Sequence, residues 1–151
     1  KTHKKENVIM NKKQKNLTNK GFSLVELIIV IAIMAVLIGV LAPQYIKYVE
    51  KSKVSTDTQL CDSVYQALNT CYIDPDIKGK PATTATATNL GADSTGDNFW
   101  TEVYGILGVT DYANLKNELK ATGAGDIQYT LSSTGAFTVT CTNSTKTITI
   151  Q

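Results

Sequence analysis

One carboxylate lies inside an apolar segment that is long enough to cross a bilayer. The segment runs from Phe22 to Ala42, and Glu26 is its single charged residue. About 20 apolar residues span the hydrocarbon core of a membrane. A charge within such a helix costs about 2.5–3.5 kcal/mol on insertion scales, so it is usually retained because something neutralises it. We expect the partner of Glu26 to be an amine.

The residues before this segment are strongly basic. Residues 1–21 contain seven lysines and one acid, Glu6, which gives +6, whereas the whole chain has a formal charge of +2. The remainder therefore carries −4, and it contains no arginine, which argues against bulk binding of nucleic acid. By the positive-inside rule, the lysines stay in the cytoplasm and the residues after the segment are exported.

The run Lys20-Gly21-Phe22-Ser23-Leu24-Val25-Glu26 and the apolar helix after it resemble the start of type IV pilins and pseudopilins. The resemblance is specific over residues 20–50 and only architectural beyond them. It implies that a prepilin peptidase cleaves after Gly21 and that the new N-terminal Phe22 is methylated. It implies that Glu26 meets the free amine of a neighbouring subunit.

The same resemblance implies partners and a location. The precursor is expected in the cytoplasmic membrane, with residues 1–21 as a cleaved cytoplasmic leader. If Met10 is the translation start, that leader has 12 residues. An assembly ATPase and a membrane platform then build copies of the chain into a helical filament, an extracellular pilus on the bacterial surface.

Three alternatives stay open at this point. A pseudopilin of a DNA-uptake or type II secretion system would share every N-terminal residue named above. A secretory signal peptide would be cut after the apolar stretch, where Ala42-Pro43-Gln44 offers a poor site. An uncleaved single-span anchor could carry a binding domain, which would need a pocket with convergent polar groups.

Helical periodicity continues beyond the apolar segment to residue 73. The apolar residues recur at intervals of three, four and seven: Val54, Cys61, Val64, Tyr65, Leu68, Cys71 and Tyr72. Pro43, which we include among the assembly residues, should kink or weaken the helix. Asp74-Pro75 should end it, because the residue before proline avoids the α region. The amphipathic half of this helix needs a cover.

The remaining residues predict loops, two short helices and three strands. Residues 76–96 are rich in Thr, Ala and Gly and should form a surface loop. One helix is expected over Phe99–Leu107, and another from an N-cap at Thr110 or Asp111 to before Gly123, with Tyr112, Leu115 and Leu119 on one face. Alternation with period two predicts three strands, with these apolar positions: Ile127, Tyr129 and Leu131; Phe137, Val139 and Cys141; Ile148 and Ile150.

These elements predict an α+β fold in which the apolar face of a small three-stranded antiparallel sheet covers the outer half of a long N-terminal helix. This arrangement is the type IV pilin fold that the leader motif implies. The domain boundaries follow: a leader over 1–21, a hydrophobic helix over 22–48, and a globular domain over 49–151.

The composition argues against an enzyme. The only histidine, His3, lies before the expected cut, so the mature chain would have neither His nor Arg. The usual general bases and oxyanion donors are then missing, and we expect no catalytic residues and no cofactor. We expect no metal either: residues 93–98 resemble a crude calcium loop, but an N-cap explains them equally well.

Three cysteines leave the disulfide question open. Cys61 and Cys71 are ten residues apart in one helix, about 15 Å, which is beyond disulfide reach. Cys141 points to the apolar face of the sheet and could meet either of them. A disulfide from Cys141 to Cys61 or Cys71, three buried thiols, and a cysteine metal site that would need the helix to end before Cys71 all remain possible.

Overall fold

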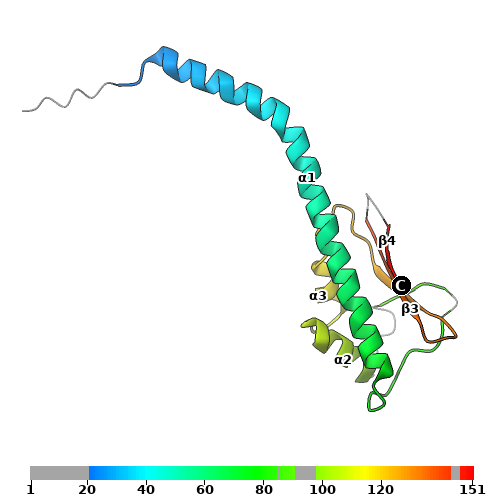
Figure 1. Ribbon diagram of the computed structural model, residues 1–151. Coiled ribbons are helices and arrows are strands. Elements are labelled where there is room, and N and C mark those ends of the chain that lie inside the picture. The colour runs from blue at the N-terminus through cyan, green and yellow to red at the C-terminus, as the bar shows by residue number, and fades with distance from the viewer. Residues whose placement is uncertain (1–20, 85, 91–97, 144–146) are drawn as a thin grey trace, which may run out of the picture. The chain divides into compact units, whose positions relative to one another are not determined.

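The computed structural model describes residues 21–84, 86–90, 98–143 and 147–151. Most of the basic leader and most of the calcium-like stretch, residues 93–97, lie outside this range. The chain divides into two compact units, one up to Val40 and one from Leu41, and each is considered by itself. The longest element, α1, runs from Leu24 to Ile73 (Figure 1).

The ends of α1 agree with the sequence. The helix stops at Ile73, directly before Asp74-Pro75, as predicted. Pro43 lies inside α1, so the lost hydrogen bond does not terminate the helix. The buried residues of α1 recur at helical spacing: Asp57, Cys61, Val64, Ala67, Leu68 and Cys71. The predicted stripe is confirmed, with two residues that we did not expect in it, Ala67 and the carboxylate Asp57.

Four antiparallel strands form one sheet, in the order β1-β2-β3-β4. Their bounds are Thr88–Asn89, Ile127–Leu131, Phe137–Thr142 and Thr147–Ile150. Buried and less buried residues alternate along β2 and β3, as a sheet with one covered face requires. The three predicted strands are confirmed, and the predicted strand count is wrong by one.

The additional strand β1 lies in the stretch predicted to be a surface loop. Thr88 pairs with Tyr129 and Asn89 with Gln128, and the N–H of Leu90 donates to the carbonyl of Ile127 over 3.0 Å. Leu90 is completely buried. Alanine and threonine alternate before this strand, but no large apolar side chain precedes Leu90 to mark it as a strand. Backbone pairing to β2 places the segment, and the buried Leu90 anchors it.

Two short helices precede β2. The first, α2, spans Asn98–Leu107 and matches the prediction to within one residue. The second, α3, spans Tyr112–Asn117 and begins at the predicted N-cap Asp111, whose side chain accepts from the N–H of Asn114. It ends before Leu119, earlier than expected. The next backbone N–H groups, of Lys120 and Ala121, donate to the carboxylate of Asp57 on α1 instead of continuing the helix.

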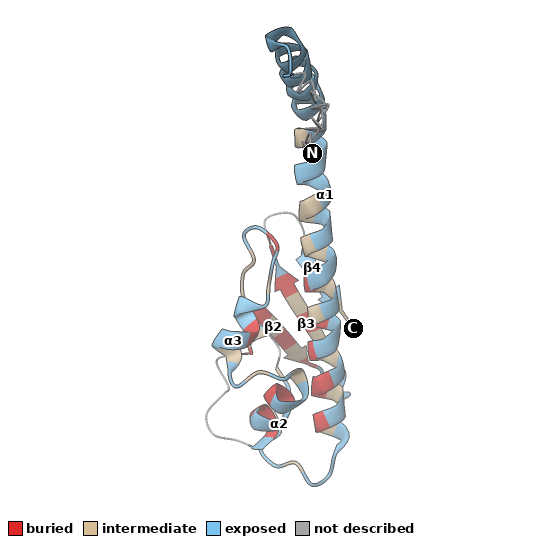
Figure 2. Ribbon diagram, turned by 90° about the vertical axis from the view of Figure 1, so that its left-hand side faces the viewer, coloured by how far each residue is buried: buried red, intermediate tan, exposed pale blue. Residues whose placement is uncertain are grey.

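The core of the second unit is one cluster between α1, the sheet and α2 (Figure 2). Phe99, Trp100, Val103 and Tyr104 supply the buried face of α2. Aromatic rings join the elements: Trp100 of α2 lies 5.4 Å from Tyr129 of β2, and Tyr72 of α1 lies 5.3 Å from Phe137 of β3. The predicted cover of α1 by the sheet is therefore present, and α2 completes it.

Candidate processing and assembly site

The first turn of α1 is capped by two of its own side chains. Ser23 precedes the first helical residue, and its hydroxyl accepts from the N–H of Val25 over 3.3 Å. The carboxylate of Glu26 accepts from the N–H of Ser23 over 2.8 Å. This reciprocal pair has the geometry of a capping box, which satisfies two of the amide groups that a helix N-terminus leaves open. The pattern Ser-x-x-Glu before an apolar run is a sequence signal for this arrangement that we did not use.

The capping box holds Glu26 in a defined place. A carboxylate has about four lone-pair positions, and the N–H of Ser23 uses one of them. Placement in the first helical turn also puts the negative charge where the helix dipole favours it. The structure therefore keeps Glu26 beside the backbone of residues 21–23, at the bond where the motif predicts cleavage, with acceptor capacity left over.

Phe22 and the apolar residues of the first unit are exposed. Phe22 is 93% exposed, and the large apolar side chains from Leu24 to Leu41 are each 51–73% exposed. The most apolar 18-residue window of α1 has a mean hydropathy of 3.1, and α1 is long and apolar enough to cross a membrane. An apolar surface of this extent requires lipid or protein around it.

The predicted site residues fall into separate groups. Gly21, Phe22 and Glu26 lie together at the start of α1. Pro43 lies 17 residues beyond Glu26 in the same helix and is not part of this N-terminal group. Within the described residues, no three His, Cys, Asp or Glu side chains are grouped in a way that could hold a metal ion.

The cysteines connect α1 to the sheet in the second unit. The structure has a disulfide between Cys61 of α1 and Cys141 of β3, separated by 80 residues in sequence. Cys71 is a buried free thiol within α1, so the helix does not end before it. Burial raises the pKa of the Cys71 thiol, and the nearby charges of Glu102 and Asp74 add to the shift.

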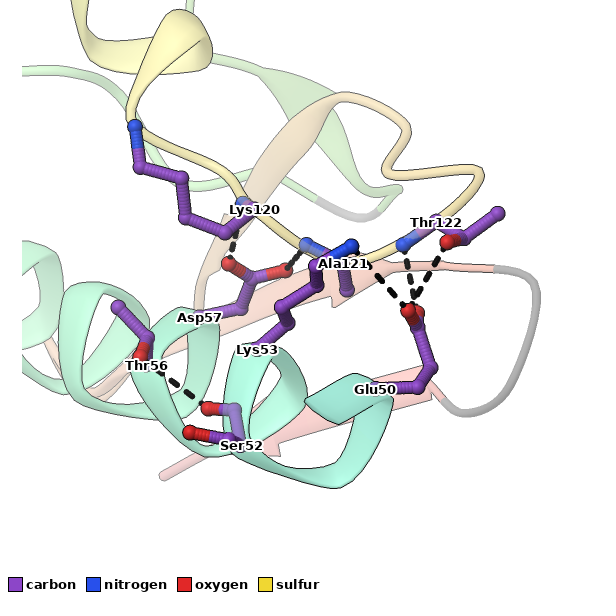
Figure 3. A network of polar contacts seen from close by, with 8 residues as sticks. All are labelled: Glu50, Ser52, Lys53, Thr56, Asp57, Lys120, Ala121 and Thr122. Atoms are coloured by element: carbon purple, nitrogen blue, oxygen red, sulfur yellow. Dashed lines mark hydrogen bonds and ion pairs between the residues drawn. The ribbon is translucent and has the colours of Figure 1, made fainter. Parts of the chain in front are cut away.

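Two carboxylates of α1 fasten the loop between α3 and β2, a feature that sequence reasoning missed (Figure 3). Both oxygens of Asp57, which is 1% exposed, accept backbone N–H groups, from Lys120 over 2.7 Å and Ala121 over 3.0 Å. Glu50 lies two turns earlier and accepts from the N–H and hydroxyl of Thr122. We call Glu50, Asp57 and residues 120–122 the carboxylate clamp.

The clamp sets the protonation of its more exposed member. The hydrogen bonds from the N–H and hydroxyl of Thr122 hold the pKa of Glu50 below its ordinary value, and Lys53 contributes from 3.6 Å.

A second network of polar side chains lies at the start of β2. There Asp126 accepts from Lys116 over 2.6 Å and from the hydroxyl of Tyr112 over 3.1 Å, and these bonds lower its pKa.

Comparison with known proteins shows what the N-terminal part of the chain is similar to. Residues 17–42 match the prokaryotic N-terminal methylation motif. Over 71 residues the chain is 37% identical to the type IV major fimbrial protein FimA of Dichelobacter nodosus, covering 47% of this chain and 46% of FimA. Over 70 residues it is 37% identical to the type IV major pilin protein PilE of Neisseria gonorrhoeae, covering 46% and 42%. No solved structure matches the chain.

The chain thus spans about half the length of the curated relatives it matches. An exposed apolar helix that carries the methylation motif, followed by a small α+β domain, is a pilin-like arrangement. Over its N-terminal half the chain is similar to type IV major pilins, and these matches support a type IV pilin family.

Proposed function

We propose that this chain is the precursor of a structural subunit of a type IV pilus. A prepilin peptidase would remove the leader after Gly21 and methylate Phe22. The assembly ATPase and its membrane platform would then transfer the subunit from the cytoplasmic membrane into an extracellular helical filament. The filament would serve adhesion, motility or a related surface role. The protein would be a polymer subunit and not an enzyme.

The exposed apolar surface of α1 is the observation that carries this proposal. Large apolar side chains are more than half exposed all around the helix from Leu24 to Leu41, and the 18-residue window has a mean hydropathy of 3.1. A helix that is apolar all round is stable only when it is surrounded. Lipid supplies that surrounding before assembly, and the same helices of neighbouring copies supply it in a filament.

Glu26 would give this association its register. In lipid a single charge is costly, and the capping box offsets only part of that cost. Cleavage after Gly21 creates an α-amine on Phe22, four residues from Glu26 in sequence. The amine of an incoming copy could pair with the carboxylate of its neighbour. Such a charge-assisted contact favours one axial offset between helices over others.

The N-terminus of assembled subunits tests the proposal. Filaments sheared from cells that express the cognate peptidase should contain a chain that begins with N-methylated Phe22, as measured by mass spectrometry of the N-terminal peptide. Gly21→Ala should leave the precursor uncut and abolish filaments, whereas the neighbouring change Asn19→Ala should not. Cleavage beyond Ala42, or filaments built from uncut precursor, would refute it.

Electron microscopy of the same cells separates a pilus from a pseudopilus. Labelling against residues 80–90 should decorate long surface filaments if the chain is a pilus subunit. Short periplasmic or wall-spanning structures would instead assign it to a DNA-uptake or type II secretion system. Label confined to the membrane would indicate a single-span anchored binding domain.

A further inference from the structure

Four residues at the start of the second unit form an exposed aromatic and basic collar on α1. They are Tyr45, Lys47, Tyr48 and Lys51. Tyr45 is 69% and Tyr48 is 67% exposed, and both lysines are exposed. The Nζ of Lys51 lies 5.8 Å from the centre of the Tyr48 ring, within cation–π range. None of the four contributes to the core of the domain.

Packing and ion pairs within the globular domain do not explain why these four side chains are present. Glu50 and Asp57 face the 120–122 loop. At 100° per residue Tyr48 lies on the opposite side of the helix, and Lys51 lies about 100° round the helix from Glu50. Lys53 pairs with Glu50 over 3.6 Å. In the part of the chain that the structure describes, neither Lys47 nor Lys51 makes an ion pair. The collar thus presents two cations and two phenols outward.

The position of the collar in the sequence matches the depth of a membrane interface. The apolar segment from Phe22 to Ala42 is about 31 Å long as a helix, the thickness of the hydrocarbon core. Tyr45 and Tyr48 follow Ala42 by three and six residues, which is about 5 and 9 Å of helix. Tyrosine is enriched at this level of a bilayer because its ring is apolar and its hydroxyl is polar.

We propose that the collar binds the phosphate groups of anionic phospholipids in the outer leaflet of the membrane that stores the precursor. This inference rests on the membrane-anchored precursor of the proposed function. The tyrosine rings lie among the headgroups, and the long stems of Lys47 and Lys51 place their ammonium groups on phosphates. Continuity with the apolar segment and the unpaired positive charge of the collar favour lipid as the occupant.

The proposed binding gives the precursor a fixed depth. Glu50, the first residue of the carboxylate clamp, lies two residues after Tyr48. Lipid bound at the collar therefore limits how far the helix can sink before the domain meets the headgroups. Transfer of a subunit into a filament must break these phosphate contacts. The depth then depends on the two lysines as well as on the length of the apolar segment.

Lipid quenching of a tryptophan in the full-length precursor tests the proposal. Tyr48→Trp places an aromatic probe in the collar, and the native Trp100 is buried and serves as a constant background. The protein is reconstituted in phosphatidylcholine bilayers that contain phosphatidylglycerol, with bromine near the top of the acyl chains of one lipid or the other. Brominated phosphatidylglycerol should quench the added tryptophan with an apparent affinity about two- to fivefold above that of brominated phosphatidylcholine.

Matched variants identify the cause. Lys47→Gln with Lys51→Gln, in the Tyr48→Trp background, should equalise the two lipids. Lys78→Gln with Lys80→Gln makes the same change in charge at exposed residues after α1 and should keep the preference. High salt should weaken the preference in the parent and leave the lysine-free collar unchanged. Gln66→Trp lies five helical turns beyond residue 48 on the same face and should be quenched by neither lipid.

Two results would overturn the collar. One is equal quenching by both lipids with Lys47 and Lys51 present. The other is quenching of Tyr48→Trp that is as weak as that of Gln66→Trp. In that case, a rise in the fluorescence of the added tryptophan with the density of protein in the bilayer would assign the collar to a second copy of the chain. The precursor is tested uncut, so a failure of processing at Gly21 refutes the pilin proposal without affecting this measurement.

Discussion

Glu26 shows how one side chain can have two roles at different stages. In the single chain it closes the capping box on the N–H of Ser23, which supports the first turn of α1. As a charge in an apolar segment, it also favours any contact that supplies a cation. Glutamine can occupy the same capping position, so a neutral substitution separates the two roles.

Glu26→Gln should therefore insert into the membrane at least as well as the parent and retain helix capping, because the desolvation cost of the charge is removed. Filament yield should nevertheless fall sharply. The measurement is the ratio of sheared filaments to membrane-bound subunit. Glu26→Asp, which keeps the charge but shortens the reach, is the matched control and should retain part of the yield. Normal assembly of Glu26→Gln would show that the carboxylate does not pair with an amine.

Asp57 illustrates the cost of removing a buried acceptor. Both of its oxygens accept backbone N–H groups of residues 120 and 121, and the side chain is 1% exposed. Asp57→Ala leaves two amides without their partner and should lower the free energy of unfolding by about 2–4 kcal/mol. Urea unfolding of the detergent-solubilised protein, followed by Trp100 fluorescence, measures this.

The control for Asp57 is Asp62, which lies on an exposed face of α1. The side chain of Asp62 accepts a hydrogen bond from the side chain of Gln66. Asp62→Ala should change the free energy of unfolding by less than about 0.5 kcal/mol. Equal effects of the two substitutions would mean that the 120–122 loop is not held by Asp57.

At the scale of elements, the disulfide joins α1 to β3 across the core. Closing a loop with a sequence separation of 80 stabilises a domain by about 4 kcal/mol in the chain-entropy model. Mass spectrometry of the non-reduced exported protein should show a peptide that links Cys61 to Cys141 and a free Cys71. Cys141→Ser should lower the free energy of unfolding by a comparable amount, whereas Cys71→Ala should cost less. A link from Cys71 would contradict the arrangement.

The short element β1 depends on its neighbours. Leu90 is fixed by the carbonyl of Ile127 and lies against α2, where the Tyr104 hydroxyl donates to the Leu90 carbonyl over 3.4 Å. Burial raises the pKa of Tyr104 to about 12, with a smaller contribution from Asp111. Local sequence preferences do not form this strand, since its neighbours are mostly threonine and alanine and have little β-branched apolar surface to bury.

At the scale of the domain, carboxylates hold the segment from α3 to β2 in place, so its stability should depend on pH. Glu50 and Asp126 have lowered pKa values in the folded state, from ordinary values of 4.5 and 3.8. A lowered folded pKa means that the stabilisation is complete above the unfolded pKa and is lost as pH falls through the folded one. The free energy of unfolding should therefore decline below about pH 4.5.

Hydrogen exchange at residues 118–127 measures this decline locally and should show faster exchange at pH 3.5 than the intrinsic pH dependence predicts. Glu50→Gln with Asp126→Asn should remove most of the difference between pH 6 and pH 3.5. Exchange in this segment that follows only the intrinsic dependence would contradict the role of the two carboxylates.

The free energy of unfolding should also decline at high pH. Burial raises the pKa of Tyr112 to about 12, and its hydroxyl bridges Asp126 and the N–H of Ile127. A raised folded pKa means that the contribution is intact below the unfolded value of 10 and is lost as pH rises toward 12. Tyr112→Phe should flatten this alkaline loss in urea titrations, while Tyr65→Phe should not. An unchanged alkaline loss in Tyr112→Phe would assign it to another group.

The sequence by itself determined the long helix, its end at Ile73, the strands β2–β4 and the N-terminal motif. These features are encoded locally, by periodicity, by proline and by the spacing of Gly21, Phe22 and Glu26. Only the tertiary structure decided the early end of α3, the strand β1 and the partners of Glu50, Asp57 and Cys141. Each of these depends on groups brought together from 39 to 80 residues apart, whose hydrogen bonds and burial no local pattern records.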